Sequence, residues 1–189
     1  MSSIRGANIL QVSAMEVSMH KAVPDFNESE TSFYYFAYGS CMCPVDLKRS
    51  LGESTHLYVV GPALLEGYRL GFFRRSLRRD CGVLDISHQP SSQVHGVLYR
   101  LPWRLSHLLD KREEGYHHHQ VNVLCNGHLY PATRTYTVTE KLNYEVAPND
   151  WYFNVVLRGA LTCGLPEQYC WQLFDHMHSL QRQIPRQAA

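Results

Sequence analysis

The sequence has no excess of charge of either sign. Lys and Arg together number 18 and Asp and Glu number 17 in 189 residues, which gives a formal net charge of +1 at pH 7. Without a global positive field, the chain has no general attraction for nucleic acid or for an anionic membrane. We therefore expect no nucleic-acid partner.

Long hydrophobic runs are also lacking. The longest mainly apolar stretch, residues 57–65, is about half of the length that a bilayer crossing needs and contains Gly61 and Pro62. The first 21 residues contain no continuous apolar segment of the signal-peptide type. We expect no membrane partner and a cytoplasmic location.

The six cysteines do not show the paired CxxC spacing of a zinc ribbon. We expect free thiols in a reducing compartment, although an even number of cysteines would also suit an exported protein. The triplet His117–His119 is a further candidate for metal binding, together with Cys41 and Cys43. Consecutive residues of an extended segment point to opposite faces, whereas zinc needs four converging ligands. We expect no metal and no other cofactor.

What the sequence does contain is the composition of a globular domain, with 44% hydrophobic and 19% charged residues. Residues 1–30 follow neither a helical nor a strand period for long, and we interpret them as a flexible leader or an extra N-terminal segment. One domain is expected over residues 31–182, followed by a frayed tail over residues 183–189. The sequence does not indicate an oligomeric state.

Strand and helix patterns alternate irregularly along this domain. The period-2 and aromatic-rich segments predict strands at 33–38, on both sides of a turn within 56–73, and at 82–86, 94–101, 120–125 and 128–136. The segment 88–93 is predicted to be a polar turn, and Asn126-Gly127 is a strong hairpin signal. Helices are expected from Pro44 to Leu51, over 102–109, from an N-cap at Asn149 to Gly164, and from Pro166 to Leu180. This pattern predicts an α+β fold with a curved or barrel-like sheet.

One candidate site lies where the first predicted strand ends, at Tyr38-Gly39-Ser40-Cys41. A strand that stops at Gly-Ser before a helix leaves backbone N–H groups without ladder partners. Such a loop can bind a carboxylate or a developing oxyanion. The alternative is that Gly39-Ser40 forms a turn with no binding role.

A second candidate is the acidic stretch around Glu113 and Glu114, which follows a predicted helix. Carboxylates at a helix C-terminus face the negative end of the macrodipole, which favours proton uptake and suits a general acid or base. The alternative is a solvated, charged helix end that Lys111 and Arg112 neutralise.

Five stretches, in this order, resemble the γ-glutamylcyclotransferase family over roughly residues 33–180. They are Phe36-Ala-Tyr-Gly-Ser40, Val60-Gly-Pro-Ala-Leu-Leu-Glu-Gly-Tyr-Arg69, Val94-His-Gly-Val-Leu-Tyr-Arg-Leu101, Leu109-Asp-Lys-Arg-Glu-Glu-Gly-Tyr116 and Gly159-Ala-Leu-Thr-Cys-Gly-Leu-Pro-Glu-Gln-Tyr169. The resemblance implies a small mixed β-barrel with flanking helices. It also implies an enzyme of the lyase or acyltransferase type that acts on a small γ-glutamyl amide. The substrate's own α-amine attacks its γ-carbonyl, forms 5-oxoproline and releases an amine without a cofactor.

The resemblance also implies roles for individual residues. The family's catalytic Glu directly precedes a Gly, which favours Glu114 over its neighbour Glu113 as the general acid/base. The backbone amides of the turn would bind the substrate's carboxylate or oxyanion, and two tyrosines would line the pocket. The expected substrate-binding residues are Tyr38, Gly39, Ser40, Cys41, Met42 and Tyr152. Tyr152 also fits a core position on an amphipathic helix.

The chain departs from the common family pattern at Cys41, where many members have Asn. This leaves two other functions open: a hydrolase or acyl transferase with Cys41 as nucleophile, and an idle domain that binds a γ-glutamyl metabolite or a protein partner. The basic residues Arg74, Arg75, Arg78 and Arg79 suit a solvated loop, or a contact to an acidic leaving group. Because loops at the pocket rim set selectivity in such a family, substrate choice is expected to depend on them.

Overall fold

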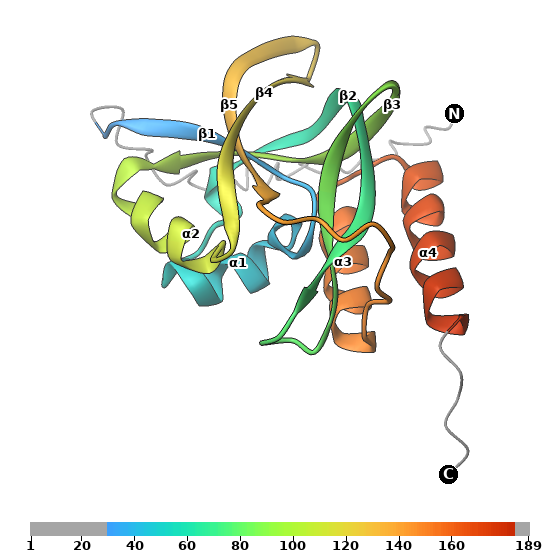
Figure 1. Ribbon diagram of the computed structural model, residues 1–189. Helices are drawn as coiled ribbons and strands as arrows, with labels where there is room; N and C mark the ends of the chain where they lie inside the picture. Colours follow the sequence, from blue (N-terminus) through green and yellow to red (C-terminus); the bar gives the residue numbers. More distant parts are fainter. Residues whose placement is uncertain (1–29, 184–189) are drawn as a thin grey trace, which may run out of the picture.

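A computed structural model describes residues 30–183, in which five strands form a closed barrel in the order β1-β3-β2-β4-β5 (Figure 1). The strands are β1 (Ser32–Ala37), β2 (Val59–Ser76), β3 (Cys81–Pro102), β4 (Tyr116–Cys125) and β5 (His128–Val138). The helices are α1 (Pro44–Leu51), α2 (Ser106–Arg112), α3 (Asp150–Thr162) and α4 (Glu167–Arg182), with 3-10 turns η1 (Ser40–Met42), η2 (His56–Tyr58) and η3 (Trp103–Leu105). The N-terminal segment and the tail predicted from the sequence lie outside these residues except for Glu30 and Gln183, so their boundaries stay predictions.

The barrel is of the mixed type. All neighbouring strands are antiparallel except β1 and β5, which run parallel where Tyr35 registers with Arg134. Helices α3 and α4 lie side by side beside the sheet, whereas α1 and α2 lie under the other end of the barrel (Figure 1). The predicted α+β class with a barrel-like sheet and flanking helices is confirmed.

The prediction of two strands within 56–73 is wrong, because β2 is one strand of 18 residues. Its register against β3 shifts between Val59 and Gly61 and again between Glu66 and Tyr68. Gly61 and Gly67 have φ of 155° and 78°, so each glycine forms a bulge in a continuous strand. Local glycine signals do not distinguish a bulge from a turn.

The predicted polar turn at 88–93 is also wrong, because these residues continue β3. His88 lies opposite Tyr68 and Gln93 opposite Glu66 on β2, and the register shifts between these two pairs, so residues 89–92 form an irregularity within β3. Most of the segment is exposed, which accounts for its polarity. The hairpin actually turns at residues 77–80.

The second hairpin agrees with the prediction. Asn126 and Gly127 both have positive φ, 50° and 77°, as a two-residue turn of the I′ type requires. The turn joins β4 to β5, with Cys125 opposite His128. Both strands exceed the predicted segments by a few residues.

The predicted helices are present, with one boundary shifted. Residues 103–105 form the 3-10 turn η3, and α2 then continues to Arg112, three residues beyond the predicted end. Helix α3 begins as expected: the Asn149 side chain accepts a hydrogen bond from Tyr152 N at 2.9 Å. Because α2 ends at Arg112, Glu113 is its C-cap residue.

Helix α3 fixes the turn that follows β1. Gly159 faces the backbone of this turn so closely that a Cβ there would lie 2.6 Å from Cys43 N. Tyr152, Val155 and Val156 of the same helix are buried in the core. The contact therefore holds the end of β1 against α3.

Two further observations concern the described residues. None of their helices is long and apolar enough to cross a membrane. All six cysteines are free, as predicted, and only Cys163 among them is partly exposed.

Candidate active site

Four parts of the chain enclose a cavity of about 60 Å³ at one end of the barrel. They are β1 with the turn that follows it, the β2–β3 hairpin, the end of α2 with the segment after it, and the start of α3; Tyr136 of β5 completes the wall. The lining residues are Tyr35, Tyr38, Gly39, Ser40, Cys41, Arg74, Ser76, Arg79, Val83, Leu84, Arg112, Glu113, Glu114, Tyr116, Tyr136 and Tyr152. Both candidate stretches from the sequence thus meet in one cavity.

The turn after β1 presents its backbone to this cavity. Met42 N donates to Gly39 O at 2.9 Å and Cys43 N donates to Ser40 O at 3.2 Å, which closes the 3-10 turn. Ser40 and Cys41 begin this turn, so their amides have no acceptor within it. These two N–H groups can serve an anionic ligand.

Met42 is placed differently from the other expected binding residues. It does not line the cavity, its side chain is fully buried, and its amide is already used by Gly39. Tyr38, Gly39, Ser40, Cys41 and Tyr152 do line the cavity.

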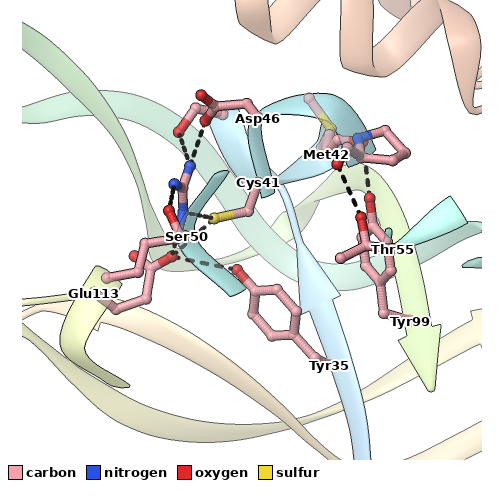
Figure 2. Close-up of polar contacts among 11 residues, drawn as sticks. Tyr35, Cys41, Met42, Asp46, Ser50, Thr55, Tyr99 and Glu113 are labelled. Atoms are coloured by element: carbon pink, nitrogen blue, oxygen red, sulfur yellow. Dashed lines mark hydrogen bonds and ion pairs between the residues drawn. The ribbon is translucent and has the colours of Figure 1, made fainter. Parts of the chain in front are cut away.

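Glu113 directs its carboxylate toward the turn. Its side chain is 14% exposed, and Oε1 accepts hydrogen bonds from Cys41 Sγ at 2.9 Å and from Tyr35 Oη at 3.5 Å (Figure 2). The chain then reverses: Tyr116 N donates to Glu113 O, and Gly115 has a φ of 82°. The left-handed conformation favours glycine at this position.

Glu114, the residue favoured by the sequence, lines the same cavity but is exposed at its edge. Within residues 30–183 it has no hydrogen bond or ion pair, whereas Glu113 has both. The geometry thus brings Glu113 rather than Glu114 into contact with the turn.

Arg112 braces the site from behind. Its side chain is 6% exposed and forms an ion pair at 2.5 Å with Asp46 of α1, which is equally buried. The guanidinium also donates to Cys41 Sγ at 2.9 Å, to Ser40 Oγ at 3.2 Å and to Ser50 Oγ. One side chain therefore joins α1, the turn and the end of α2.

The Cys41 thiol lies between the two charged residues. It donates to Glu113 and accepts from Arg112 (Figure 2). Burial, partly opposed by Arg112 and reinforced by Glu113, raises the pKa of this thiol from 9.0 to about 12. The thiol therefore stays protonated near neutrality and acts as a hydrogen-bonding group.

Tyrosines line the walls and are held by backbone groups. Tyr38 Oη donates to Tyr136 O at 2.5 Å, and Tyr116 Oη donates to Leu84 O at 3.1 Å. Tyr152 Oη accepts from Leu84 N at 3.0 Å and is buried, with a raised pKa that results mainly from desolvation. Tyr152 is thus a core residue and a cavity residue at once.

The sequence interpretation missed several of these residues. Arg112 was expected to neutralise a solvated helix end, but it is buried and pairs with a residue 66 positions away. Tyr35 and Tyr116 were not selected as site residues, although both line the cavity. An alternation count along β1 would have placed Tyr35 on the same face as Ala37, but it gives no sign of a cavity.

The histidine triplet does not converge. His117 bonds Thr137 Oγ1 at 2.8 Å, His118 bonds Asp110 Oδ1 at 2.5 Å, and His119 bonds Tyr68 Oη at 2.7 Å. Within the described part of the chain, no three or more His, Cys, Asp or Glu residues form a group able to hold a metal ion.

The sequence of this chain is similar to those of known proteins. Residues 93–173 match the AIG2-like family. The chain is 31% identical over 178 residues to YkqA of Bacillus subtilis, which is assigned only provisionally as a γ-glutamylcyclotransferase. The match covers 92% of this chain and 61% of YkqA, so the chain spans about three fifths of the length of that curated relative.

Solved structures agree with this result. The YkqA crystal structure superposes with a TM-score of 0.73 at 32% identity, over 80% of this chain and 56% of that one. A γ-glutamyl cyclotransferase gives 0.69 at 24% identity over 76% of this chain and 86% of that one. An uncharacterised Homo sapiens protein gives 0.68 at 26%, over 76% and 87% respectively. The expected resemblance and the expected fold are confirmed.

Proposed function

We propose that this chain, which resembles the γ-glutamylcyclotransferase family in sequence and fold, releases an amine or amino acid from a γ-glutamyl amide and forms 5-oxoproline. The observation that carries the proposal is the Glu113 carboxylate, which lies in the cavity facing the turn at Gly39–Cys41. An internal acyl transfer needs a group that moves protons and donors that stabilise the oxyanion, and a carboxylate and free backbone amides in one cavity can supply both.

In this reaction the nucleophile belongs to the substrate. Glu113 takes a proton from the α-ammonium group, and the freed amine attacks the γ-carbonyl carbon to form the new C–N bond. Glu113 passes the first proton to solvent and takes a second proton from the attacking nitrogen, which became positively charged on attack. The tetrahedral intermediate then collapses, the bond to the leaving nitrogen breaks, and Glu113 delivers this second proton to the leaving nitrogen. Holding both reacting groups in one molecule removes the entropic cost of a bimolecular encounter.

The turn after β1 supplies the hydrogen-bond donors that stabilise negative charge on the substrate. The amides of Ser40 and Cys41 donate to the γ-carbonyl oxyanion or to the α-carboxylate, while Tyr38 and Tyr152 shape the wall. Arg112 holds Ser40, Cys41 and Asp46 in place, so it acts as a positioning residue. Cys41 orients Glu113 through its hydrogen bond and stays protonated, which argues against a thiol nucleophile.

The test compares Glu113→Gln with Glu114→Gln, two changes that remove the same charge from adjacent residues. Release of 5-oxoproline is measured from glutathione, a γ-glutamyl dipeptide, an ε-lysine isopeptide and a γ-glutamylated amine. We expect Glu113→Gln to lower kcat by a factor of about 10²–10⁴, the usual contribution of a general acid/base. Glu114→Gln should stay within a few-fold of the parent, and Cys41→Ser should retain turnover.

The opposite ranking would assign the base to Glu114, the residue that the sequence favours. Loss of turnover in Cys41→Ser together with a trapped acyl-enzyme would replace this mechanism by nucleophilic catalysis. If the folded parent releases nothing from any of the four compounds, the chain is an idle binding domain of the same fold.

A further inference from the structure

A second, larger cavity of about 410 Å³ adjoins the first. Arg79 and Arg112 line both cavities, and the second also has Asp46, Arg49, Ser50, Arg78, Asn149 and Trp151 in its walls. The second cavity shares the wall of Arg79 and Arg112 with the one that holds Glu113, so it offers room for the part of a substrate beyond the γ-glutamyl half.

The walls of this second cavity have an excess of positive charge. Arg112 is neutralised by its buried ion pair with Asp46. Within residues 30–183, Arg49, Arg78 and Arg79 have no ion pair, whereas the neighbouring Arg75 pairs with Asp80 at 2.7 Å on the outside. These three guanidinium groups of the second cavity are therefore without a carboxylate partner among the described residues.

Arg79 stands at the junction of the two cavities. Its guanidinium carbon lies 5.7 Å from the ring centroid of Trp151, in the second cavity, and 6.0 Å from that of Tyr152, in the first. Its backbone carbonyl accepts a hydrogen bond from Asn149 Nδ2 at 2.9 Å. Arg79 is thus held against the start of α3, where Asn149, Trp151 and Tyr152 all lie.

Arg74 adds a further cation to the wall of the first cavity. Its guanidinium carbon lies 4.8 Å from the Tyr116 ring centroid, and it packs against Gly115, where a Cβ would meet Nη2 at 2.1 Å. Arg74 Nη1 is buried and has no hydrogen-bond partner among the described residues. A buried donor without a partner costs free energy, which an anionic ligand would offset.

We propose that this arrangement selects γ-glutamyl compounds whose leaving amine is a dicarboxylic amino acid. The inference rests on the proposed function and names its substrate class. The α-carboxylate of the leaving group pairs with Arg79 and with Arg74 Nη1, which both line the first cavity. The second carboxylate pairs with Arg78 and Arg49 in the larger cavity, because guanidinium groups bind carboxylates in a bidentate manner. A leaving amine without carboxylates would leave these cations unpaired, and a cationic amine would be repelled.

The test uses three compounds with leaving groups of similar length. γ-Glutamyl-glutamate presents two carboxylates on the leaving side, γ-glutamyl-glutamine presents one, and γ-glutamyl-butylamine presents none. We expect kcat/KM to fall roughly tenfold from γ-glutamyl-glutamine to γ-glutamyl-butylamine, and several-fold from γ-glutamyl-glutamate to γ-glutamyl-glutamine, because Arg49 and Arg78 are exposed and water weakens their pairs. Equal kcat/KM for the three compounds would overturn the inference and leave the proposed function intact.

Variants identify the residues responsible. Arg49→Gln and Arg78→Gln, which remove the proposed partners of the second carboxylate, should each reduce the preference for γ-glutamyl-glutamate over γ-glutamyl-glutamine several-fold. Arg75→Gln is the matched control: it removes the same charge from the hairpin that holds Arg78, but Arg75 lines neither cavity, so its preference should equal that of the parent. An equal change in all three variants would mean that only overall charge matters, and the inference would fail.

A binding measurement separates this inference from the proposed function. Glu113→Gln, which should bind substrate without turning it over, is titrated calorimetrically with γ-glutamyl-glutamate and γ-glutamyl-butylamine. Tighter binding of the first, reduced in the double variant with Arg78→Gln, supports a basic subsite for an acidic leaving group even if the parent releases no 5-oxoproline. Equal affinity for the two compounds overturns it.

Discussion

Cys41 is a cysteine that two neighbouring charges keep in its neutral form. Its thiol donates to Glu113 and accepts from Arg112, both at 2.9 Å, and its residue is 6% exposed. Desolvation is the largest cause of its high pKa; Arg112 lowers the pKa and Glu113 raises it. A hydroxyl or amide side chain could make the same two hydrogen bonds, so the position needs a donor and acceptor rather than a thiolate.

This leads to a prediction about reactivity with pH. With a pKa raised from 9.0 to about 12, the thiolate fraction of Cys41 at pH 8 is about a thousandfold lower than that of an ordinary cysteine. We expect iodoacetamide to leave Cys41 unmodified in the folded protein at pH 8, and alkylation to increase only as the pH approaches 12. Peptide mass spectrometry after timed alkylation measures this.

Cys163 is the internal control, because it is the partly exposed cysteine among the six. It should be alkylated before Cys41 at every pH at which the protein is folded. Rapid modification of Cys41 at pH 7–8, with the fold intact, would restore the thiol as a candidate nucleophile.

Helices α1 and α2 are joined by a buried ion pair. Arg112 at the end of α2 meets Asp46 in the first turn of α1, and both side chains are 6% exposed. Glu113 follows Arg112 directly, so the orientation of the site carboxylate depends on this connection between two helices. A surface pair of the same type joins Arg104 to Glu53 at 2.6 Å, with side chains 49% and 32% exposed.

Removing one partner from each pair should give very different results. Asp46→Ala leaves the buried guanidinium with only the longer contact to Glu113 at 3.9 Å, and we expect a loss of about 3 kcal/mol in the free energy of unfolding, the lower end for a broken buried pair. Glu53→Ala affects an exposed pair, for which about 0–1 kcal/mol is expected. Urea unfolding of the two variants measures both. Similar small losses would mean that solvent reaches the Asp46–Arg112 pair.

At the scale of the whole molecule, the barrel closes along a narrow seam. Strands β1 and β5 register at one pair of residues, Tyr35 and Arg134, whereas β2 and β3 pair along most of their length. The buried Thr135 hydroxyl reinforces the seam by donating to Phe36 O at 2.9 Å. Because β1 leads directly into the turn of the site, opening of this seam would disturb the cavity.

Thr135→Val should therefore weaken the seam specifically. We expect a loss of about 1–3 kcal/mol, since a buried carbonyl loses its donor, and faster hydrogen exchange in β1. Thr133→Val is the control: Thr133 is equally buried, but its hydroxyl bonds Tyr130 O within β5. Hydrogen-exchange mass spectrometry should show faster exchange of β1 peptides in the first variant only. The same exchange pattern in both variants would show that this hydroxyl does not hold the seam.

The features that the sequence predicted correctly are those with local causes. Asn126 and Gly127 form the hairpin turn, and Asn149 caps α3, because each depends on the backbone preferences or side-chain bonds of a few neighbouring residues. The errors at 56–73 and 88–93 have the opposite origin. Long strands with bulges and exposed middle segments are stabilised by pairing with a partner strand along the rest of their length, which overrides local glycine and polar signals.

The sequence by itself determined the fold class, the family resemblance and the two stretches that meet at the site, because these depend on periodicity and motif order. Only the tertiary structure decided that Glu113, rather than Glu114, contacts the turn and that Arg112 is buried. It also decided that Arg74 and Arg79 face the cavities while Arg75 faces outward. Adjacent residues of one type are indistinguishable in sequence; contacts with residues such as Cys41, 72 positions away, determine which of them enters the site.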